Sequence, residues 1–164
     1  MAFNKDQFKS LIEKVLTKMD MNSKSAVNLL LGTAAQESGF GTYLRQLGDG
    51  PALGVFQMEP ATERDIWSNY LAYREKETNI IEYLVSITGA DGKYSLDLEG
   101  NLIYQIAMAR LHYRRVKEPL PLFDDINGLA RYWKNHYNTI HGKGTIEEFI
   151  KNYYKYVIKT IMDN

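Results

Sequence analysis

The sequence predicts a mainly α-helical protein with at most one small β-hairpin, and three observations favour this class. Apolar residues recur at helical spacing in about seven segments of the chain. Capping residues, prolines and glycines stand at the ends of those segments. The 164 residues contain no internal repeat and no low-complexity linker, so we expect one domain spanning residues 1–164.

The first two predicted helices differ in how their apolar residues are distributed. The first is amphipathic, with an apolar face made by Phe8, Leu11, Ile12, Val15 and Met19. The second begins near Ala26, after N-cap candidates at residues 22–25, and is apolar on nearly every side as far as Thr33. A helix that is apolar all round belongs inside a core, so we expect the second helix to be central.

A glycine-rich segment follows the central helix. Five of the twelve glycines lie between Gly39 and Gly54, together with Pro51, which predicts a loop or a short irregular hairpin over a cleft. Pro60 is suited to the first turn of a helix that continues to Tyr73. Another helix is expected from about Thr78 to Ile87.

The C-terminal half continues the helical pattern. Residues 89–93 predict a turn that could join two short strands, followed by a polar loop to Asn101. A long helix is then expected over residues 102–116, because the segment 118–121 contains two prolines that end it.

Two further helices complete the prediction. Asp124 or Asp125 can cap a helix that carries Leu129, Tyr132, Trp133 and His136. After a break at residues 142–144, Thr145 and Glu148 have the spacing of a capping box for a last helix that extends to Ile161.

Composition excludes several classes of function. Twenty basic and twenty acidic residues give a formal net charge of zero, which disfavours nucleic-acid binding. The absence of cysteine excludes disulfides and thiolate metal sites. The three histidines lack metal-ligand spacing, so we expect no metal and no cofactor. No apolar run is long enough to span a membrane, and charged residues interrupt the N-terminus, which argues against a Sec signal.

Glu37 is the strongest candidate for a catalytic residue. It follows the apolar helix directly and precedes the glycine-rich loop, so it should lie where a buried helix meets an open cleft. Such a position suits a general acid, because partial burial raises the pKa of a carboxyl group that substrate can still reach. Thr33, Gln36 and Glu37 share one helical face, although these polar residues are also what an ordinary helix end would carry.

A second segment, residues 50–62, offers groups that suit a sugar-binding cleft. Gly54 permits close backbone approach, and Gln57 can donate and accept hydrogen bonds to hydroxyl or acetamido groups. Glu59 and Asp49 are alternative second carboxylates, although Glu59 is better explained as stabilising the N-terminus of the helix that begins at Pro60.

These two segments together resemble a known family. Glu37-Ser38, followed by Gly54-Val55-Phe56-Gln57-Met58-Glu59-Pro60-Ala61-Thr62, is similar to the Glu-Ser and Gly-Leu-Met-Gln-x-x-Pro-x-Thr signatures of soluble lytic transglycosylases and goose-type lysozymes. Asn79-Ile80 and Tyr83-Leu84 look like the helix that follows in that family. The resemblance covers roughly residues 26–145, and its most specific part is 34–62.

The resemblance implies a lysozyme-like helical domain that cleaves peptidoglycan. It implies that Glu37 is the obligatory acid/base, and that the segment carrying Ser38, Gln57 and Glu59 lines the substrate groove. The family's third signature, Ala-Tyr-Asn-Ala-Gly, is not present as such. Its tyrosine would be either Tyr113, on the expected helix, or Tyr137, which precedes Asn138. Residues 132–139 resemble small lysozyme-like proteins of tailed bacteriophages.

The resemblance therefore implies a glycosidase that cuts the β-1,4 bond between N-acetylmuramic acid and N-acetylglucosamine. A lytic transglycosylase is favoured over a hydrolytic lysozyme, because no second acid has a motif of its own. A non-catalytic virion protein of the same fold and a chitinase-type glycosidase are the rival interpretations. We expect a monomer that acts on peptidoglycan strands, either in a virion beside other virion proteins or after release into the host periplasm or cell wall.

Overall fold

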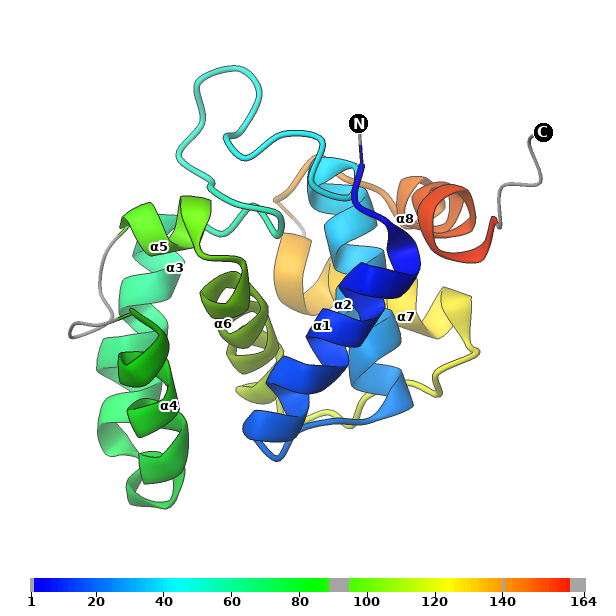
Figure 1. Cartoon of the computed structure of the whole chain (residues 1–164). Coiled ribbons are helices and arrows are strands. Elements are labelled where there is room, and N and C mark those ends of the chain that lie inside the picture. Colours follow the sequence, from blue (N-terminus) through cyan, green and yellow to red (C-terminus); the bar gives the residue numbers. More distant parts are fainter. Residues whose placement is uncertain (1, 89–94, 140, 160–164) are drawn as a thin grey trace.

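The computed structural model describes residues 2–88, 95–139 and 141–159, and these ranges contain eight α-helices (Figure 1). The helices are α1 (Lys5–Lys18), α2 (Lys24–Ser38), α3 (Pro60–Asp65), α4 (Thr78–Thr88), α5 (Ser95–Gly100), α6 (Leu102–Arg114), α7 (Ile126–Trp133) and α8 (Ile146–Tyr153). Within the described ranges, β structure is limited to isolated bridges that join Leu53 to Arg45 and to Met58. The prediction of a mainly α protein is confirmed.

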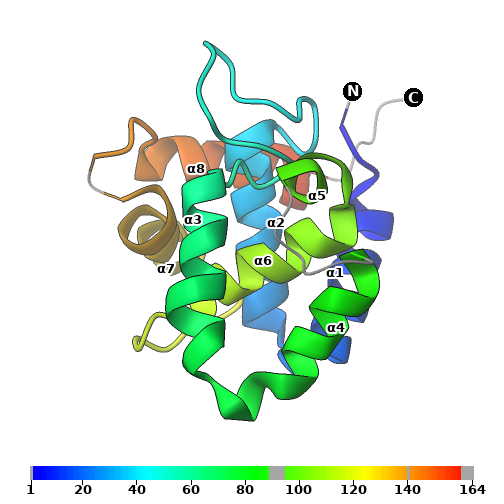
Figure 2. The same ribbon diagram turned by 90° about the vertical axis from the view of Figure 1, so that its left-hand side faces the viewer.

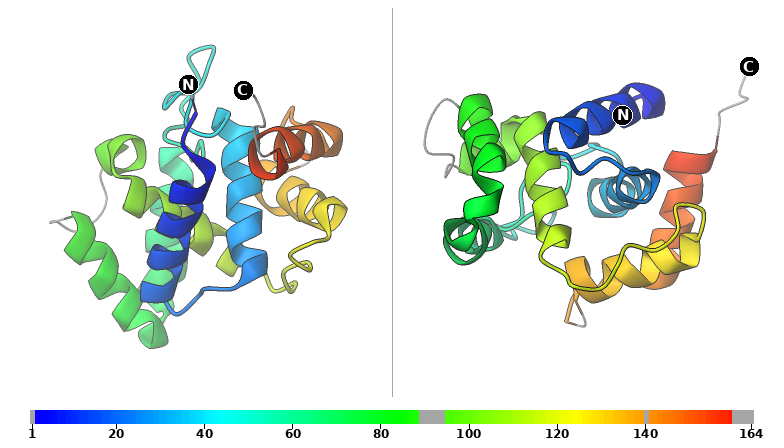
Figure 3. Two further views of the ribbon diagram at one scale, coloured as in Figure 1. Left: turned by 45° about the vertical axis from the view of Figure 1, so that its right-hand side comes forward. Right: turned by 90° about the horizontal axis from the view of Figure 1, so that it is seen from below.

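Helix α2 is the centre of the fold. It packs against α1, α6, α7 and α8, and Figure 3 shows it between α1 on one side and α7 with α8 on the other. Leu29, Leu30 and Leu31 are all buried although they point in different directions, as an all-apolar helix requires. The helix begins at Ser23, whose hydroxyl accepts the amide N–H of Ala26, and it ends at Gly39 in the left-handed conformation.

The predicted caps of the last two helices are confirmed. The Asp125 carboxylate accepts the amide N–H of Gly128 and begins α7. Thr145 and Glu148 form a complete capping box at the start of α8, with each side chain accepting the other's amide N–H.

The predicted helix from Pro60 to Tyr73 is interrupted. It begins with Pro60 in the first turn, as expected, but α3 continues into a π-helical turn, η1 (Ile66–Tyr70), and a 3-10 turn, η2 (Leu71–Tyr73). Figure 2 shows this segment along one face of the molecule, with α4 returning from its lower end. The arm formed by η1, α4 and their connection packs on α6.

Three boundaries differ from the sequence prediction. The expected polar loop before Asn101 contains α5, whose Leu98 is buried in the core, so a short helix replaces irregular chain. Helix α6 ends at Arg114, and α8 passes into a π-helical turn, η5 (Tyr154–Ile158). The predicted turn at residues 89–93 and the end of the last helix at Ile161 lie outside the described residues. Among the helices of the described chain, none is long and apolar enough to cross a bilayer.

Candidate active site

Glu37 lies in the last turn of α2, where the buried helix reaches a cleft. The cleft has a volume of about 710 Å³, and Glu37 lies on its wall. The tip of the loop that follows α2 forms one side through Tyr43, Gln46 and Leu47. The position predicted for Glu37 from the sequence, between core and open loop, is the one the structure gives it.

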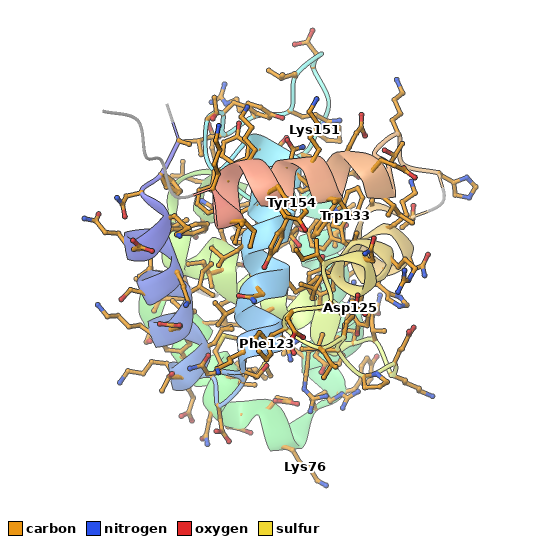
Figure 4. All side chains as sticks on the ribbon, turned by 90° about the vertical axis from the view of Figure 1, so that its right-hand side faces the viewer. Lys76, Phe123, Asp125, Trp133, Lys151 and Tyr154 are labelled. Atoms are coloured by element: carbon orange, nitrogen blue, oxygen red, sulfur yellow. The ribbon has the colours of Figure 1, made fainter. Side chains whose placement is uncertain are left out.

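Among the described residues, the carboxyl group of Glu37 has one side-chain hydrogen-bond partner. The indole N–H of Trp133, at the end of α7, donates to Glu37 Oε1 over 2.8 Å. Trp133 is fully buried and packs on Phe149 of α8, with the two ring centroids 5.3 Å apart. Figure 4 shows Trp133 beneath α8, where α7 approaches α2. The partner of the carboxyl group is therefore fixed rigidly by the core.

Burial sets the protonation of Glu37. Loss of solvent raises the pKa of its carboxyl group to about 7, against the opposing effect of the Trp133 hydrogen bond, which favours the ionised form. A carboxyl group with this pKa holds and releases a proton at neutral pH, as a combined general acid and base must.

Two tyrosines lie close to Glu37, but they occupy different places. Tyr113 is buried, and its hydroxyl shares a 2.8 Å hydrogen bond with Thr33 on α2. Tyr137 lines the cleft and donates its hydroxyl to the carbonyl oxygen of Phe56 over 2.8 Å. Burial raises the pKa of both hydroxyls well above the usual value, and the charge of Glu37 adds to this effect. Both hydroxyls therefore stay protonated near neutral pH, and of the two only Tyr137 borders the cleft.

Tyr137 belongs to η4 (Lys134–Asn138), a π-helical turn that continues α7. The ammonium group of Lys134 fixes the part of the cleft wall that follows η4. Its Nζ donates to Asn138 Oδ1 and to the carbonyl oxygens of Gly142 and Gly144, at 2.7, 2.9 and 2.7 Å. Asn138, predicted to bind substrate, lines the cleft but uses this oxygen within the wall.

His112 supports the other side of Tyr137. Its ring meets the Tyr137 ring edge-on, with centroids 4.8 Å apart, and its Nδ1 accepts from Arg115 over 2.7 Å. Arg115 in turn pairs with Asp65 at the end of α3. Burial, followed by the Arg115 charge, lowers the pKa of His112 to about 4, so this histidine is neutral at pH 7.

Gln57 and Glu59 both lie on the cleft wall, as predicted. The Gln57 side chain donates to the Gly54 carbonyl oxygen over 2.8 Å, and its backbone is left-handed with φ of 47°. Glu59 is exposed and stands at the N-cap position of α3, but its side chain accepts no capping hydrogen bond from the first turn of the helix. Among the described residues that line the cleft, Glu37 and Glu59 are the acidic ones.

Three sequence interpretations change with the structure. Ser38 is fully buried, and its hydroxyl contacts the Ala34 carbonyl and the Gly41 amide, so it shapes the helix end and does not line the cleft. Asp49 is exposed on the loop and is not a cleft residue. The close backbone approach at Gly54 is to the Leu98 carbonyl of α5, because a Cβ there would lie 2.1 Å from that oxygen.

Sequence reasoning did not identify Trp133, His112 or Lys134 as site residues. The usable signal for Trp133 was its spacing from Tyr137, since residues four apart share one helical face. In the described part of the chain, no group of three or more His, Asp or Glu residues is placed to hold a metal ion. Comparisons of this chain with protein-family models, with curated proteins and with solved structures find no match.

Proposed function

We propose that the protein cleaves the β-1,4 bond between N-acetylmuramic acid and N-acetylglucosamine in peptidoglycan, with Glu37 as general acid and base. The observation that supports this most is the Glu37 carboxyl group, whose pKa of about 7 is set by burial at the edge of an open cleft. The cleft has the aromatic and amide side chains that suit a glycan, including Tyr43, Tyr137 and Gln57.

In the proposed reaction, protonated Glu37 gives its proton to the glycosidic oxygen as the bond from that oxygen to the muramyl anomeric carbon breaks. The ionised carboxylate then takes the proton from the 6-hydroxyl of the same muramyl residue, whose oxygen bonds to the anomeric carbon. The products are a free N-acetylglucosamine hydroxyl and a 1,6-anhydro ring, and Glu37 ends protonated. One carboxyl group near its pKa performs both transfers.

Hydrolysis is the second candidate, and Glu59 is the residue that favours it. In a lysozyme-type reaction a second carboxylate assists water or stabilises the sugar cation, and Glu59 lies on the same cleft wall as Glu37. Glu59 is exposed on that wall, so both water and substrate can reach its carboxyl group.

Mass spectrometry of digested peptidoglycan tests the proposal. Anhydro-muropeptides are expected from the transglycosylase reaction, and reducing ends would indicate hydrolysis instead. Intact strands from folded protein would contradict both and favour a non-catalytic virion protein. We propose further that the protein acts as a monomer, either from a phage particle or after release toward the host cell wall.

The Trp133 hydrogen bond predicts how activity depends on pH. Activity should fall above about pH 7 as Glu37 ionises, because the acid form starts the reaction. Trp133→Phe keeps an aromatic ring in the core but removes the N–H that favours the ionised form of Glu37. The pKa of Glu37 should therefore rise, and the pH at which activity falls on the alkaline side should move upward by about one pH unit. The measurement is the cleavage rate between pH 5 and 9.

Trp67→Phe is the matched control for this prediction. Trp67 donates its indole N–H to Tyr104 and does not line the cleft. Removing this N–H should therefore leave unchanged the pH at which activity falls on the alkaline side. If activity of Trp133→Phe falls at the same alkaline pH as that of the wild type, Glu37 is not the titrating acid.

A further inference from the structure

Two amide side chains near Glu37 take no part in the proposed proton transfers. Gln36 precedes Glu37 in the last turn of α2, and Asn138 is the last residue of η4. Both line the cleft, and both are half-buried. Each amide group has one acceptor oxygen and one NH2 group that donates. The partners of the two oxygens therefore decide which end of each amide is left for a ligand.

The oxygen of each amide is already used within the protein. Gln36 Oε1 accepts from Asn152 Nδ2, on α8, over 2.8 Å. Asn138 Oδ1 accepts from the ammonium group of Lys134 over 2.7 Å. An ammonium group can only donate, so Lys134 fixes which end of the Asn138 amide is the oxygen. The NH2 ends of both side chains are thus left for another partner.

The two nitrogens come together at Gly144, which also lines the cleft. A Cβ placed on Gly144 would lie 3.2 Å from Gln36 Nε2 and 3.2 Å from Asn138 Nδ2. It would also lie 2.7 Å from Cη2 of Trp133, the residue whose indole N–H contacts Glu37. Because position 144 carries no side chain, nothing from this residue covers the two NH2 groups.

Both NH2 groups lack an acceptor among the described residues. Neither Gln36 Nε2 nor Asn138 Nδ2 donates a hydrogen bond to an oxygen of those residues. A half-buried N–H without an acceptor costs free energy, so an oxygen from solvent or from a ligand is favoured here. Lys143, exposed in the same turn as Gly144, adds another donor to the lining. This part of the cleft therefore suits a group that accepts hydrogen bonds.

We propose that Gln36 and Asn138 bind the carbonyl oxygen of an amide substituent on the glycan, next to the bond that Glu37 cleaves. A carbonyl oxygen has two lone pairs and no hydrogen of its own, so it matches two N–H donors. Peptidoglycan carries such a carbonyl in the acetamido group and in the lactyl amide that begins the peptide stem. The pair therefore selects N-acylated glycan over glycan with free amino groups. The inference rests on the proposed function in requiring that a glycan occupies the cleft.

Calorimetry with the N-acetylglucosamine hexamer tests this pair. The titrations use the full chain carrying Glu37→Gln, so that cleavage does not enter the result. Gln36→Glu keeps the oxygen that Asn152 binds, and replaces only the NH2 group by a second oxygen. Asn138→Asp does the same while keeping the oxygen that Lys134 binds. We expect each change to weaken binding of the hexamer about 10-fold, because a hydrogen bond is lost and an oxygen faces the carbonyl oxygen instead.

Gln7→Glu is the matched control, because Gln7 is exposed on α1, does not line the cleft, and gains the same negative charge. It should bind the hexamer as the Glu37→Gln parent does. The glucosamine hexamer, which lacks the acetyl groups, gives a readout that a loss of structure would not produce. The parent should prefer the acetylated hexamer by about 10-fold or more. Gln36→Glu should reduce or reverse this preference, since a carboxylate accepts from an amino group.

A soluble glycan that carries peptide stems distinguishes the two sources of the carbonyl group. Weaker binding of the N-acetylglucosamine hexamer by Gln36→Glu and Asn138→Asp assigns the acetamido group. Unchanged binding of that hexamer with weaker binding of the peptide-bearing glycan assigns the lactyl amide. No saturable binding of either ligand, or equal binding of both ligands by Gln36→Glu, Asn138→Asp and Gln7→Glu, overturns the inference. If these binding differences hold but the wild type releases no muropeptides, the reaction assigned to Glu37 fails alone.

Discussion

Glu37→Gln is expected to reduce peptidoglycan cleavage by about 10³-fold or more while the protein stays folded, because it removes the group that performs both proton transfers. Glutamine matches glutamate in shape, and its side-chain oxygen can still accept the Trp133 N–H. The measurement is the rate of muropeptide release, with circular dichroism to verify the fold. Wild-type release by Glu37→Gln would remove Glu37 from the mechanism.

Two further variants make the Glu37→Gln result specific. Glu82→Gln, on the exposed face of α4, should retain wild-type activity and controls for the loss of one negative charge. Glu59→Gln separates the two reaction types. In a transglycosylase, Glu59→Gln should change the rate of muropeptide release by no more than a few-fold. In a hydrolase that uses Glu59 as base, the rate should fall about 10²-fold or more.

Gly54→Ala is expected to destabilise the protein by about 3 kcal/mol, from two effects that add. The Gly54 backbone has φ of 77°, a conformation that costs a residue with a Cβ roughly 1–2 kcal/mol. The new Cβ would also lie 2.1 Å from the backbone oxygen of Leu98, which cannot move aside as a side chain can, and relieving such a contact costs about 1–3 kcal/mol. Urea denaturation measures the loss.

Gly48→Ala is the control that separates these effects. Gly48 has a similar φ of 80°, but no atom of the described residues lies within 4 Å of the position its Cβ would take. It should therefore show the conformational part alone, about 1 kcal/mol. Equal losses in the two variants would mean that α5 does not constrain the loop at Gly54.

The local sequence pattern identified the central helix and the place of Glu37. Both depend on neighbours along the chain: an apolar run that must be buried, and a loop that must follow it. The capping box at Thr145 and Glu148 is equally local, because its two residues are three positions apart. These features could be predicted because the residues that determine them are adjacent in sequence.

The missed features depend on contacts between distant segments. The indole of Trp133 and the carboxyl group of Glu37 meet from positions 96 residues apart, and nothing in either local sequence specifies that contact. Whether Tyr113 or Tyr137 borders the cleft depends on the packing of α6 against α2 and η4, which buries Tyr113 in the core and leaves Tyr137 on the cleft wall. The role of Gly54 likewise depends on α5, which the polar composition of its segment concealed.

The burial of Glu37 also couples folding to hydrogen-ion uptake. The carboxyl group titrates near 4.5 when solvated and its pKa is about 7 in the fold, so between these values the folded chain holds a proton that the unfolded chain has released. The free energy of unfolding should therefore decline as pH rises through this interval, by up to about 3 kcal/mol. The native state is thus least favoured, as far as this group is concerned, in alkaline solution, where the acid it shelters has lost its proton.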